Sequence, residues 1–281
     1  MAESLVPIPD IEQLSPQVIR VLGGNPGKFT LQGTNTYIIG TGTQRILLDT
    51  GEGKPAWLTS IKKVLSEQNI NIATALLSHW HHDHIDGVPD LLSHSPSTEV
   101  YKRDPKEGWK DISDGQTFST EGATLTAFHC PGHTKDHMAF VLAEEKAMFT
   151  ADNVLGQGTA VFEDLATYMD SLAAMSKHSQ FTGRAYPGHG PVIEDGRGKV
   201  LEYIKHRKER EKQVLDVLAK EKEDGWTSWD IVKVIYRDYP ESLWKPAEMG
   251  VLQILGKLEK EGKIVKDKER GTWALSGKAA L

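Results

Sequence analysis

One six-residue run, His-Trp-His-His-Asp-His at positions 79–84, constrains this chain more than any other feature. It follows an apolar stretch at 75–77 that is typical of a buried strand, so the run begins a loop at the strand's C-terminal end. Two of its histidines lie two positions apart and can point to the same side of an extended loop, whereas the closing Asp-His pair turns the other way. Imidazole and carboxylate ligands suit zinc and, less selectively, iron or manganese. The spacing therefore predicts two adjacent metal positions rather than a polar surface cluster.

Three further positions complete the set on chemical grounds, because each of them follows a predicted strand. The sequence Pro-Gly-His occurs at 131–133 and again at 187–189, and each copy places a histidine on a tight turn. A carboxylate, Asp152, ends another strand. Strand ends converge at one edge of a sheet, so we expect these side chains to meet. The predicted metal ligands are His79, His81, Asp83, His84, His133, Asp152 and His189.

The first two-thirds of the chain alternates short strands and helices. A half-buried strand is predicted at 17–22, a hairpin from 36–40 and 45–49, and helices at 55–65 and 165–175. Strands at both ends of this region, with helices between them, predict a two-layer sheet core covered by helices. At 281 residues the chain is long enough for one large domain with a small appendage, which we place at 1–204 and 205–281.

The C-terminal region is predicted to be mainly helical and is more strongly charged than the rest of the chain. A long helical stretch at 193–223 mixes charges of both signs around 205–212, as a solvated helix face usually does. Beyond Gly225 the order helix, helix, hairpin predicts a winged-helix-like module. Such modules bind nucleic acid but also mediate oligomerisation, so a homo-oligomer stays open as an alternative. Trp226, Trp229, Trp244 and Trp273 could stack on bases but are more often core residues in a module this small.

Charge and cysteine content narrow the classes of function. The net charge of −6 is uneven, since residues from 205 onward carry 17 Lys and Arg against 14 Asp and Glu. An acidic body with a slightly basic tail is weak support for nucleic-acid binding. A single cysteine, Cys130, excludes an internal disulfide framework and fits a reducing compartment. With no membrane-span-length apolar run, signal peptide or presequence pattern, we expect a cytoplasmic location and no membrane partner.

The ligand set resembles that of the metallo-β-lactamase fold superfamily, whose His-x-His-x-Asp-His motif and later His, Asp and His ligands match in order. The resemblance covers nearly the whole chain and implies an αββα sandwich over about residues 15–200, followed by a small winged-helix-like domain. It also implies that His79, His81 and His133 hold one metal. Asp83, His84, the bridging Asp152 and His189 would hold the second, and the expected cofactor is two zinc ions.

Within the superfamily, three stretches at 31–37, 134–138 and 152–156 resemble proteins with a C-terminal winged-helix extension. Two groups share this outline: animal lactamase-beta-like endoribonucleases of single-stranded RNA, and fungal thioesterases that release polyketides from acyl carrier protein. Stretches at 53–55, 88–91 and 114–116 look more like the fungal group. Two positions depart from the pattern, because Asp86 stands where Gly or Ser is common and Ala151 replaces the usual Gly.

The predicted chemistry is hydrolysis by a metal-bridging hydroxide, which attacks an electrophilic carbonyl or phosphorus. Asp83 is a ligand that could also orient the proton of the nucleophile, so it is a catalytic candidate. Asp49, at a strand end, is expected to hold a ligand histidine in orientation, unless it only caps a turn. His137 could be a general acid or substrate contact, or equally a structural histidine.

The leaving group separates the alternatives. A thiol with a pKa near 8.5 departs as thiolate with little acid assistance, whereas an RNA alkoxide gains much from a general acid. We therefore expect a thioesterase acting on an acyl (polyketide) group carried by acyl carrier protein, or on a small thioester. The alternatives are an endoribonuclease with single-stranded RNA as substrate, a lactone, β-lactam or glyoxalase-type hydrolase, and a non-catalytic winged-helix binding protein. The complete ligand set argues against the last of these.

Overall fold

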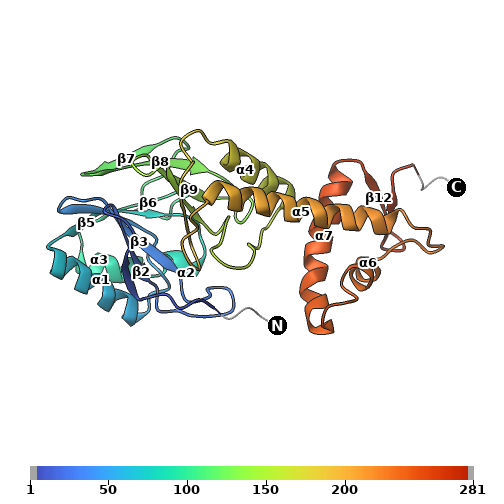
Figure 1. Cartoon of the computed structure of the whole chain (residues 1–281), viewed down its shortest axis with the longest axis horizontal. Coiled ribbons are helices and arrows are strands. Elements are labelled where there is room, and N and C mark those ends of the chain that lie inside the picture. The colour runs from blue at the N-terminus through green and yellow to red at the C-terminus, as the bar shows by residue number, and fades with distance from the viewer. Residues whose placement is uncertain (1–4, 278–281) are drawn as a thin grey trace. The chain divides into compact units, whose positions relative to one another are not determined.

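The computed structural model describes residues 5–277, which form two compact units. The first comprises residues 5–163 and 167–201, and the second comprises residues 164–166 and 202–277. The division falls within the long helix α5 (Gly196–Leu218). The strands of the two large sheets belong to the first unit, and the second unit is mainly helical (Figure 1).

Two sheets make up the centre of the first unit. The six-stranded sheet runs in the order β1 to β6, and its strands are β1 (Ile11–Gln13), β2 (Val18–Leu22), β3 (Asn35–Ile39), β4 (Gln44–Leu48), β5 (Asn71–Leu77) and β6 (Glu99–Lys102). The five-stranded sheet has the order β11 (Ala185–Pro187), β10 (Ala147–Ala151), β9 (Met138–Leu142), β8 (Ala123–His129) and β7 (Thr117–Thr120). The predicted hairpin is confirmed, because β3 and β4 pair antiparallel.

A single buried cluster joins the inner faces of the two sheets. Side chains alternate along each strand, so Tyr37 and Ile39 of β3 face this cluster whereas Ile38 faces the opposite side. Phe140 and Phe149 contribute from the second sheet, and the ring centroids of Phe149 and Tyr37 lie 5.0 Å apart. All of β3 is buried because both faces of its sheet are covered. The two-layer prediction is therefore confirmed.

Helices cover the outer faces. α1 (Pro55–Gln68) and α3 (Val88–His94) pack on the six-stranded sheet, where Trp57 and Ile61 join a second buried cluster. α4 (Leu165–Lys177) contacts loops of the other sheet, since Tyr168 donates to the Asn153 carbonyl and Ser171 to that of Pro131. α1 begins with Pro55 at its first turn, where the missing amide hydrogen is not needed, and ends at Asn69 in a left-handed conformation. The expected αββα architecture is confirmed.

The second unit contains a helix pair and a two-stranded sheet. Its elements after α5 are α6 (Ser228–Ile235), the 3-10 turn η1 (Glu241–Leu243), α7 (Trp244–Lys260), β12 (Ile264–Asp267) and β13 (Thr272–Leu275). The Thr227 hydroxyl caps α6 by accepting a hydrogen bond from the Asp230 amide, and the Asp230 carboxylate accepts one from the Thr227 amide. This order confirms the winged-helix arrangement. Among residues 5–277, no helix combines the length and apolar character that crossing a bilayer requires.

Candidate metal centre

The predicted ligands all lie at one edge of the sandwich, where strands end. β4 and β5 are parallel, so Asp49 and His79 follow their C-terminal ends side by side. β8, β10 and β11 end at the same edge of the other sheet and lead to His133, Asp152 and His189. After His81 the chain turns into the short helix α2 (His82–Ile85), which carries Asp83 and His84. The His84 ring packs against that of His79, with ring centroids 4.2 Å apart. The structure therefore brings together all seven predicted side chains.

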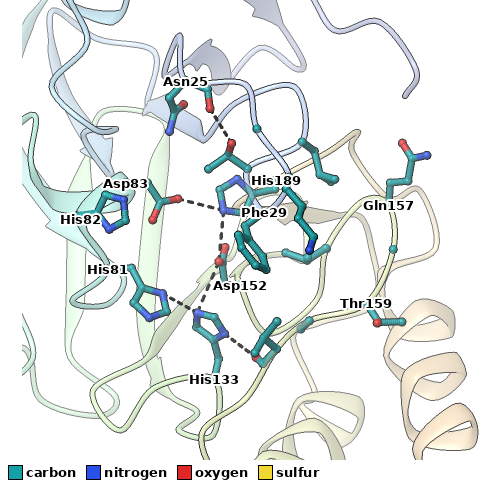
Figure 2. A pocket seen from close by; sticks show the side chains of 18 of the residues that line it. Asn25, Phe29, His81, His82, Asp83, His133, Asp152, Gln157, Thr159 and His189 are labelled. Atoms are coloured by element: carbon teal, nitrogen blue, oxygen red, sulfur yellow. Dashed lines mark hydrogen bonds and ion pairs between the residues drawn. The ribbon is translucent and has the colours of Figure 1, made fainter. Parts of the chain in front are cut away.

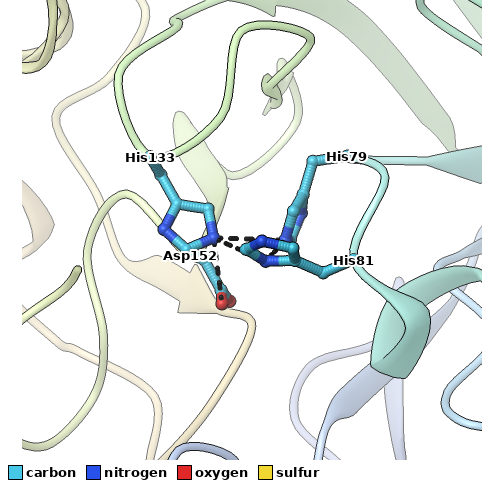
Figure 3. Close-up of side chains that lie close together, drawn as sticks. All are labelled: His79, His81, His133 and Asp152. Atoms are coloured by element: carbon cyan, nitrogen blue, oxygen red, sulfur yellow. Dashed lines mark hydrogen bonds and ion pairs between the residues drawn. The ribbon is translucent and has the colours of Figure 1, made fainter. Parts of the chain in front are cut away.

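Three imidazole nitrogens form the first group of ligand atoms (Figure 3). His81 Nδ1 lies 3.0 Å from His79 Nε2 and 3.0 Å from His133 Nε2, and the last two atoms are 3.3 Å apart. Each ring that presents Nε2 is anchored through its other nitrogen. His133 Nδ1 donates to the Val161 carbonyl at 2.7 Å, and His79 Nδ1 meets the Ser78 hydroxyl at 2.9 Å.

The second group combines carboxylate oxygens with imidazoles. Asp83 Oδ2 lies 3.4 Å from His84 Nε2 and 3.3 Å from His189 Nε2. Asp152 reaches the same two rings, with Oδ1 3.4 Å from His84 Nε2 and Oδ2 3.3 Å from His189 Nε2. The Oδ2 atom of Asp152 is also 3.6 Å from His133 Nε2 in the first group. Asp152 thus stands between the two groups, as a bridging ligand would.

These spacings fit a metal better than direct hydrogen bonds. Ligand atoms placed tetrahedrally at about 2.0–2.1 Å from one ion lie about 3.3 Å from each other. The separations in both groups cluster around that value, and they are longer than strong charge-assisted hydrogen bonds. Within the described residues, His84 Nε2 and Asp152 Oδ1 are buried with no hydrogen-bond partner. The donor set of imidazoles and carboxylates therefore fits a pair of divalent ions.

The protonation states of the site residues also favour a bound cation. Burial lowers the pKa of His79 well below its usual value, and it lowers the pKa of His81 to about 4, so both rings are neutral and able to ligate. Burial alone would raise the pKa of Asp83 and Asp152, but the facing imidazoles hold both carboxyls ionised. Burial opposes protonation of His189, yet Asp152 raises its pKa to about 9. Without an ion, protonated imidazoles must balance these carboxylates, which is the charge that a cation would supply.

The Asp49 carboxylate binds the segment 78–84 through hydrogen bonds to Ser78 and His84. Its Oδ2 accepts from His84 Nδ1 at 2.8 Å and from the Ser78 hydroxyl at 2.8 Å, and its Oδ1 accepts the Ser78 amide at 2.8 Å. Because the Ser78 hydroxyl donates to Asp49, it accepts a hydrogen bond from His79 Nδ1 and so orients that ring as well. The carboxylate therefore fixes the tautomers of two ligand histidines and leaves each Nε2 facing the site. The contact that we expected for Asp49 is present, and Ser78 is a supporting residue that the sequence alone did not single out.

Asparagine at Asp49 is expected to weaken metal affinity about 10- to 100-fold, the usual effect of losing such a supporting partner. Asp49 has φ 59, a conformation that asparagine adopts readily, so the backbone should be unchanged. Zinc affinity measured by competition with a chromogenic chelator tests this, and the metal-free melting temperature serves as the folding control. Unaltered affinity with a normal fold would show that Asp49 only caps the turn.

The stretch 34–37 anchors the second group from the other side. The Thr34 hydroxyl lies 3.1 Å from Asp83 Oδ2, and Thr34 is itself held by the Asn25 side chain. Asn35 donates to the carbonyls of Pro187 and Gly190, which brackets the turn that carries His189. None of these roles was predicted. The signal available was the position of this stretch just before and at the start of β3, which is far from the His189 turn in the sequence but begins beside it in space.

The two Pro-Gly-His turns need their glycines for different reasons. Gly132 has φ 134, and a Cβ there would meet the backbone of Tyr168 on α4. A Cβ at Gly188 would collide with Asp152 Oδ1, because this turn passes directly over the Asp152 carboxylate. The turns are therefore tight because other parts of the site occupy the space that a side chain would fill.

A cavity of about 640 Å³ opens over both groups (Figure 2). His81, Asp83, His133, Asp152 and His189 lie on its floor, and the loops at 25–31 and 155–163 form its walls. Its volume is in the range of small-molecule sites, about 300–1,000 Å³. The site is thus open to a substrate, although most of its ligands are buried.

Family models match the chain in two segments. Residues 29–205 match the metallo-beta-lactamase superfamily, and residues 227–273 match the beta-lactamase associated winged helix domain. The chain belongs to the metallo-beta-lactamase superfamily. The resemblance stated from the ligand motif is confirmed, and so is the winged-helix extension.

Curated relatives within the superfamily align over most of their length. A protein of Aspergillus chevalieri, named atrochrysone carboxyl ACP thioesterase, is 45% identical over 97% of this chain and 91% of its own length. Lactamase-like protein ptaB of Pestalotiopsis fici is 47% identical over 96% of this chain and 90% of its own. A solved beta-lactamase domain protein from Burkholderia ambifaria matches at a TM-score of 0.80 and 16% identity, covering 98% of this chain and 96% of that one. The last match supports the fold alone.

The structure also places the candidate acid His137 and the two positions that depart from the family pattern, Asp86 and Ala151. His137 is buried, its Nε2 accepts the Asp152 amide at 3.2 Å, and its Nδ1 lies 3.3 Å from Cys130 Sγ. It does not line the cavity, so its contacts favour the structural alternative over the general acid. Asp86 is exposed and also lies outside the cavity lining. Ala151 has φ 42, a conformation that glycine adopts more easily.

Proposed function

We propose that this protein is a metal-dependent thioesterase that releases an acyl (polyketide) group from an acyl carrier protein. The observation that carries the proposal is the pair of ligand groups sharing Asp152 on the floor of a cavity large enough for an acyl group. The relatives named as atrochrysone carboxyl ACP thioesterases give the substrate class, and one of them aligns with 97% of the chain. We keep the cytoplasmic location as a prediction.

The proposed cofactor is two zinc ions, with iron or manganese as alternatives for the same ligands. His79, His81 and His133 would hold one ion, and Asp83, His84 and His189 the other, with Asp152 between them. When bound, the ions would supply Lewis acidity, which lowers the pKa of a water towards neutrality and polarises the thioester carbonyl. Asp83 would in addition orient the proton of the attacking water, because its Oδ2 is held by the Thr34 hydroxyl on one side.

A thioester suits the site better than RNA does. The thiolate leaving group needs little acid assistance, and His137, the acid that the sequence offered for RNA cleavage, lies outside the cavity lining. RNA binding also requires several phosphate contacts. Among the described residues that line the cavity, Lys28 is the one lysine or arginine.

One purified sample tests the proposal against its alternative. We expect the zinc-loaded protein to hydrolyse acyl N-acetylcysteamine thioesters, to lose this activity with chelator, and to leave a fluorescent single-stranded RNA intact. Asp83→Ala should abolish thioester turnover, because it removes a ligand and the group that orients the water. RNA cleavage that requires Asp83, without thioester turnover, would replace the thioesterase with an endoribonuclease.

A further inference from the structure

A turn at the cavity wall presents two side chains that the proposed hydrolysis does not use. The Gly27 amide donates to the Leu31 carbonyl at 3.0 Å, and the Gly33 amide donates to the Thr30 carbonyl at 2.8 Å. The Thr30 hydroxyl donates to the Asn25 carbonyl at 2.6 Å. These bonds close a short, cross-linked turn whose tip is Lys28-Phe29. The side chain of Asn25 in turn holds Thr34, which contacts the ligand Asp83, so the turn is tied to the metal centre.

The tip residues are exposed and lie on the cavity. Phe29 is 71% exposed although it is a large apolar side chain, and Lys28 is exposed beside it. The Lys28 ammonium lies 5.5 Å from the centroid of the Phe29 ring. Both residues line the cavity that holds Asp152 and His189, and Figure 2 shows Phe29 among these lining side chains. The turn therefore fixes an apolar ring at the mouth of the cavity, within reach of a ligand bound there.

The segment 155–163 supplies a second part of the cavity lining, and it is also tied to the metal centre. Val161 is 62% exposed, and its carbonyl accepts from the ligand His133 at 2.7 Å. Phe162 stacks on Tyr168, with ring centroids 5.1 Å apart. Gln157 and Thr159 add polar groups on this side of the cavity. A flat acyl group placed over the metal centre would thus have both the Phe29 ring and the Val161 side chain in the lining around it.

We propose that Lys28 and Phe29 form an acyl-selecting clamp for planar, aromatic acyl groups that carry an anionic oxygen. The Phe29 ring stacks on the acyl group, and the Lys28 ammonium pairs with a carboxylate or ionised phenol at the end remote from the thioester. Two observations specify this ligand: an exposed ring calls for an apolar, planar partner, and the one lysine or arginine among the described lining residues calls for an anion. This inference rests on the proposed thioesterase function.

The test compares three N-acetylcysteamine thioesters: butanoyl, 2-naphthoyl and 6-carboxy-2-naphthoyl. Phe29→Ala is expected to raise KM for both naphthoyl substrates about 5- to 10-fold, the range of one aromatic contact, and to leave the butanoyl substrate within about twofold. Lys28→Met should raise KM about threefold to fivefold for the carboxynaphthoyl substrate alone, as expected for an exposed ion pair, and Lys28→Arg should restore it. Leu5→Ala and Lys62→Met, at exposed positions outside the cavity lining, are the matched controls.

The outcomes separate the clamp from the thioesterase proposal. Butanoyl turnover reports the thioesterase alone, so equal losses on all three substrates in Phe29→Ala would overturn the clamp. Amide analogues of the naphthoyl compounds, which are not hydrolysed, extend the test to binding by calorimetry on the zinc-loaded protein. If no thioester is turned over but the amides bind in a Phe29-dependent manner, the clamp stands and the thioesterase fails. Binding that is indifferent to both substitutions would overturn the clamp whatever the activity.

Discussion

Replacing Asp152 with asparagine is expected to lower kcat/KM for a thioester by at least about 10³-fold, more than the loss of one oxyanion-hole donor, which costs about 10²–10³. The side chain keeps its shape but exchanges one oxygen for a hydrogen-bond donor. Oδ1 faces His84, and Oδ2 faces both His189 and His133. Asparagine has one side-chain oxygen, so it can offer a ligand atom on only one of these two sides. Steady-state kinetics with zinc in excess, together with the bound zinc per protein, provide the measurement.

Asp86→Asn is the matched control for this substitution. Asp86 is a carboxylate three residues after Asp83, but it is exposed and lies outside the cavity lining. We expect its kcat/KM to stay within about twofold of wild type, as is usual for surface changes. If Asp152→Asn kept more than a tenth of the wild-type activity with two zinc ions bound, the bridging role would be wrong. Circular dichroism should show that both variants keep the fold.

Removal of the metal is expected to lower the melting temperature by about 8–16 °C for each ion that is lost. An ion present at a thousand times its Kd adds about 4 kcal/mol to stability, and each kcal/mol shifts Tm by about 2–4 °C in a protein of about this size. The physical cause is the buried charge of Asp83 and Asp152, which only protonated imidazoles balance when no ion is bound. Calorimetry before and after dialysis against chelator measures the change.

Zinc added back should restore the melting temperature, and magnesium should not, because magnesium prefers oxygen ligands. The Asp152→Asn variant is the second control, since it binds metal less tightly and should lose less stability on chelation. A melting temperature that does not respond to chelator in the wild-type protein, with metal loss verified by elemental analysis, would contradict the metal centre inferred from the ligand spacing.

The interpretation of His137 shows where prediction from the sequence ends. Its position four residues after His133 allowed either a catalytic or a structural role, because sequence spacing says nothing about which way a side chain points from an irregular segment. The fold places the ring under Asp152, where a backbone amide occupies Nε2. The same limit applies to Ser78, whose hydroxyl links Asp49 to His79 only because β4 and β5 are neighbours in the sheet.

The sequence by itself determined the residues of the candidate site, since ligand chemistry and strand-end spacing are local properties that are readable at His79–His84 and in two Pro-Gly-His turns. It also determined the layered architecture through the alternation of apolar residues. The tertiary structure decided which nitrogen of each histidine faces the centre, that Asp152 lies between the two groups, and that the turn carrying Lys28 and Phe29 lines the same cavity as Val161. These features depend on contacts between segments that are distant in the sequence, and only the packing of the two sheets sets such contacts.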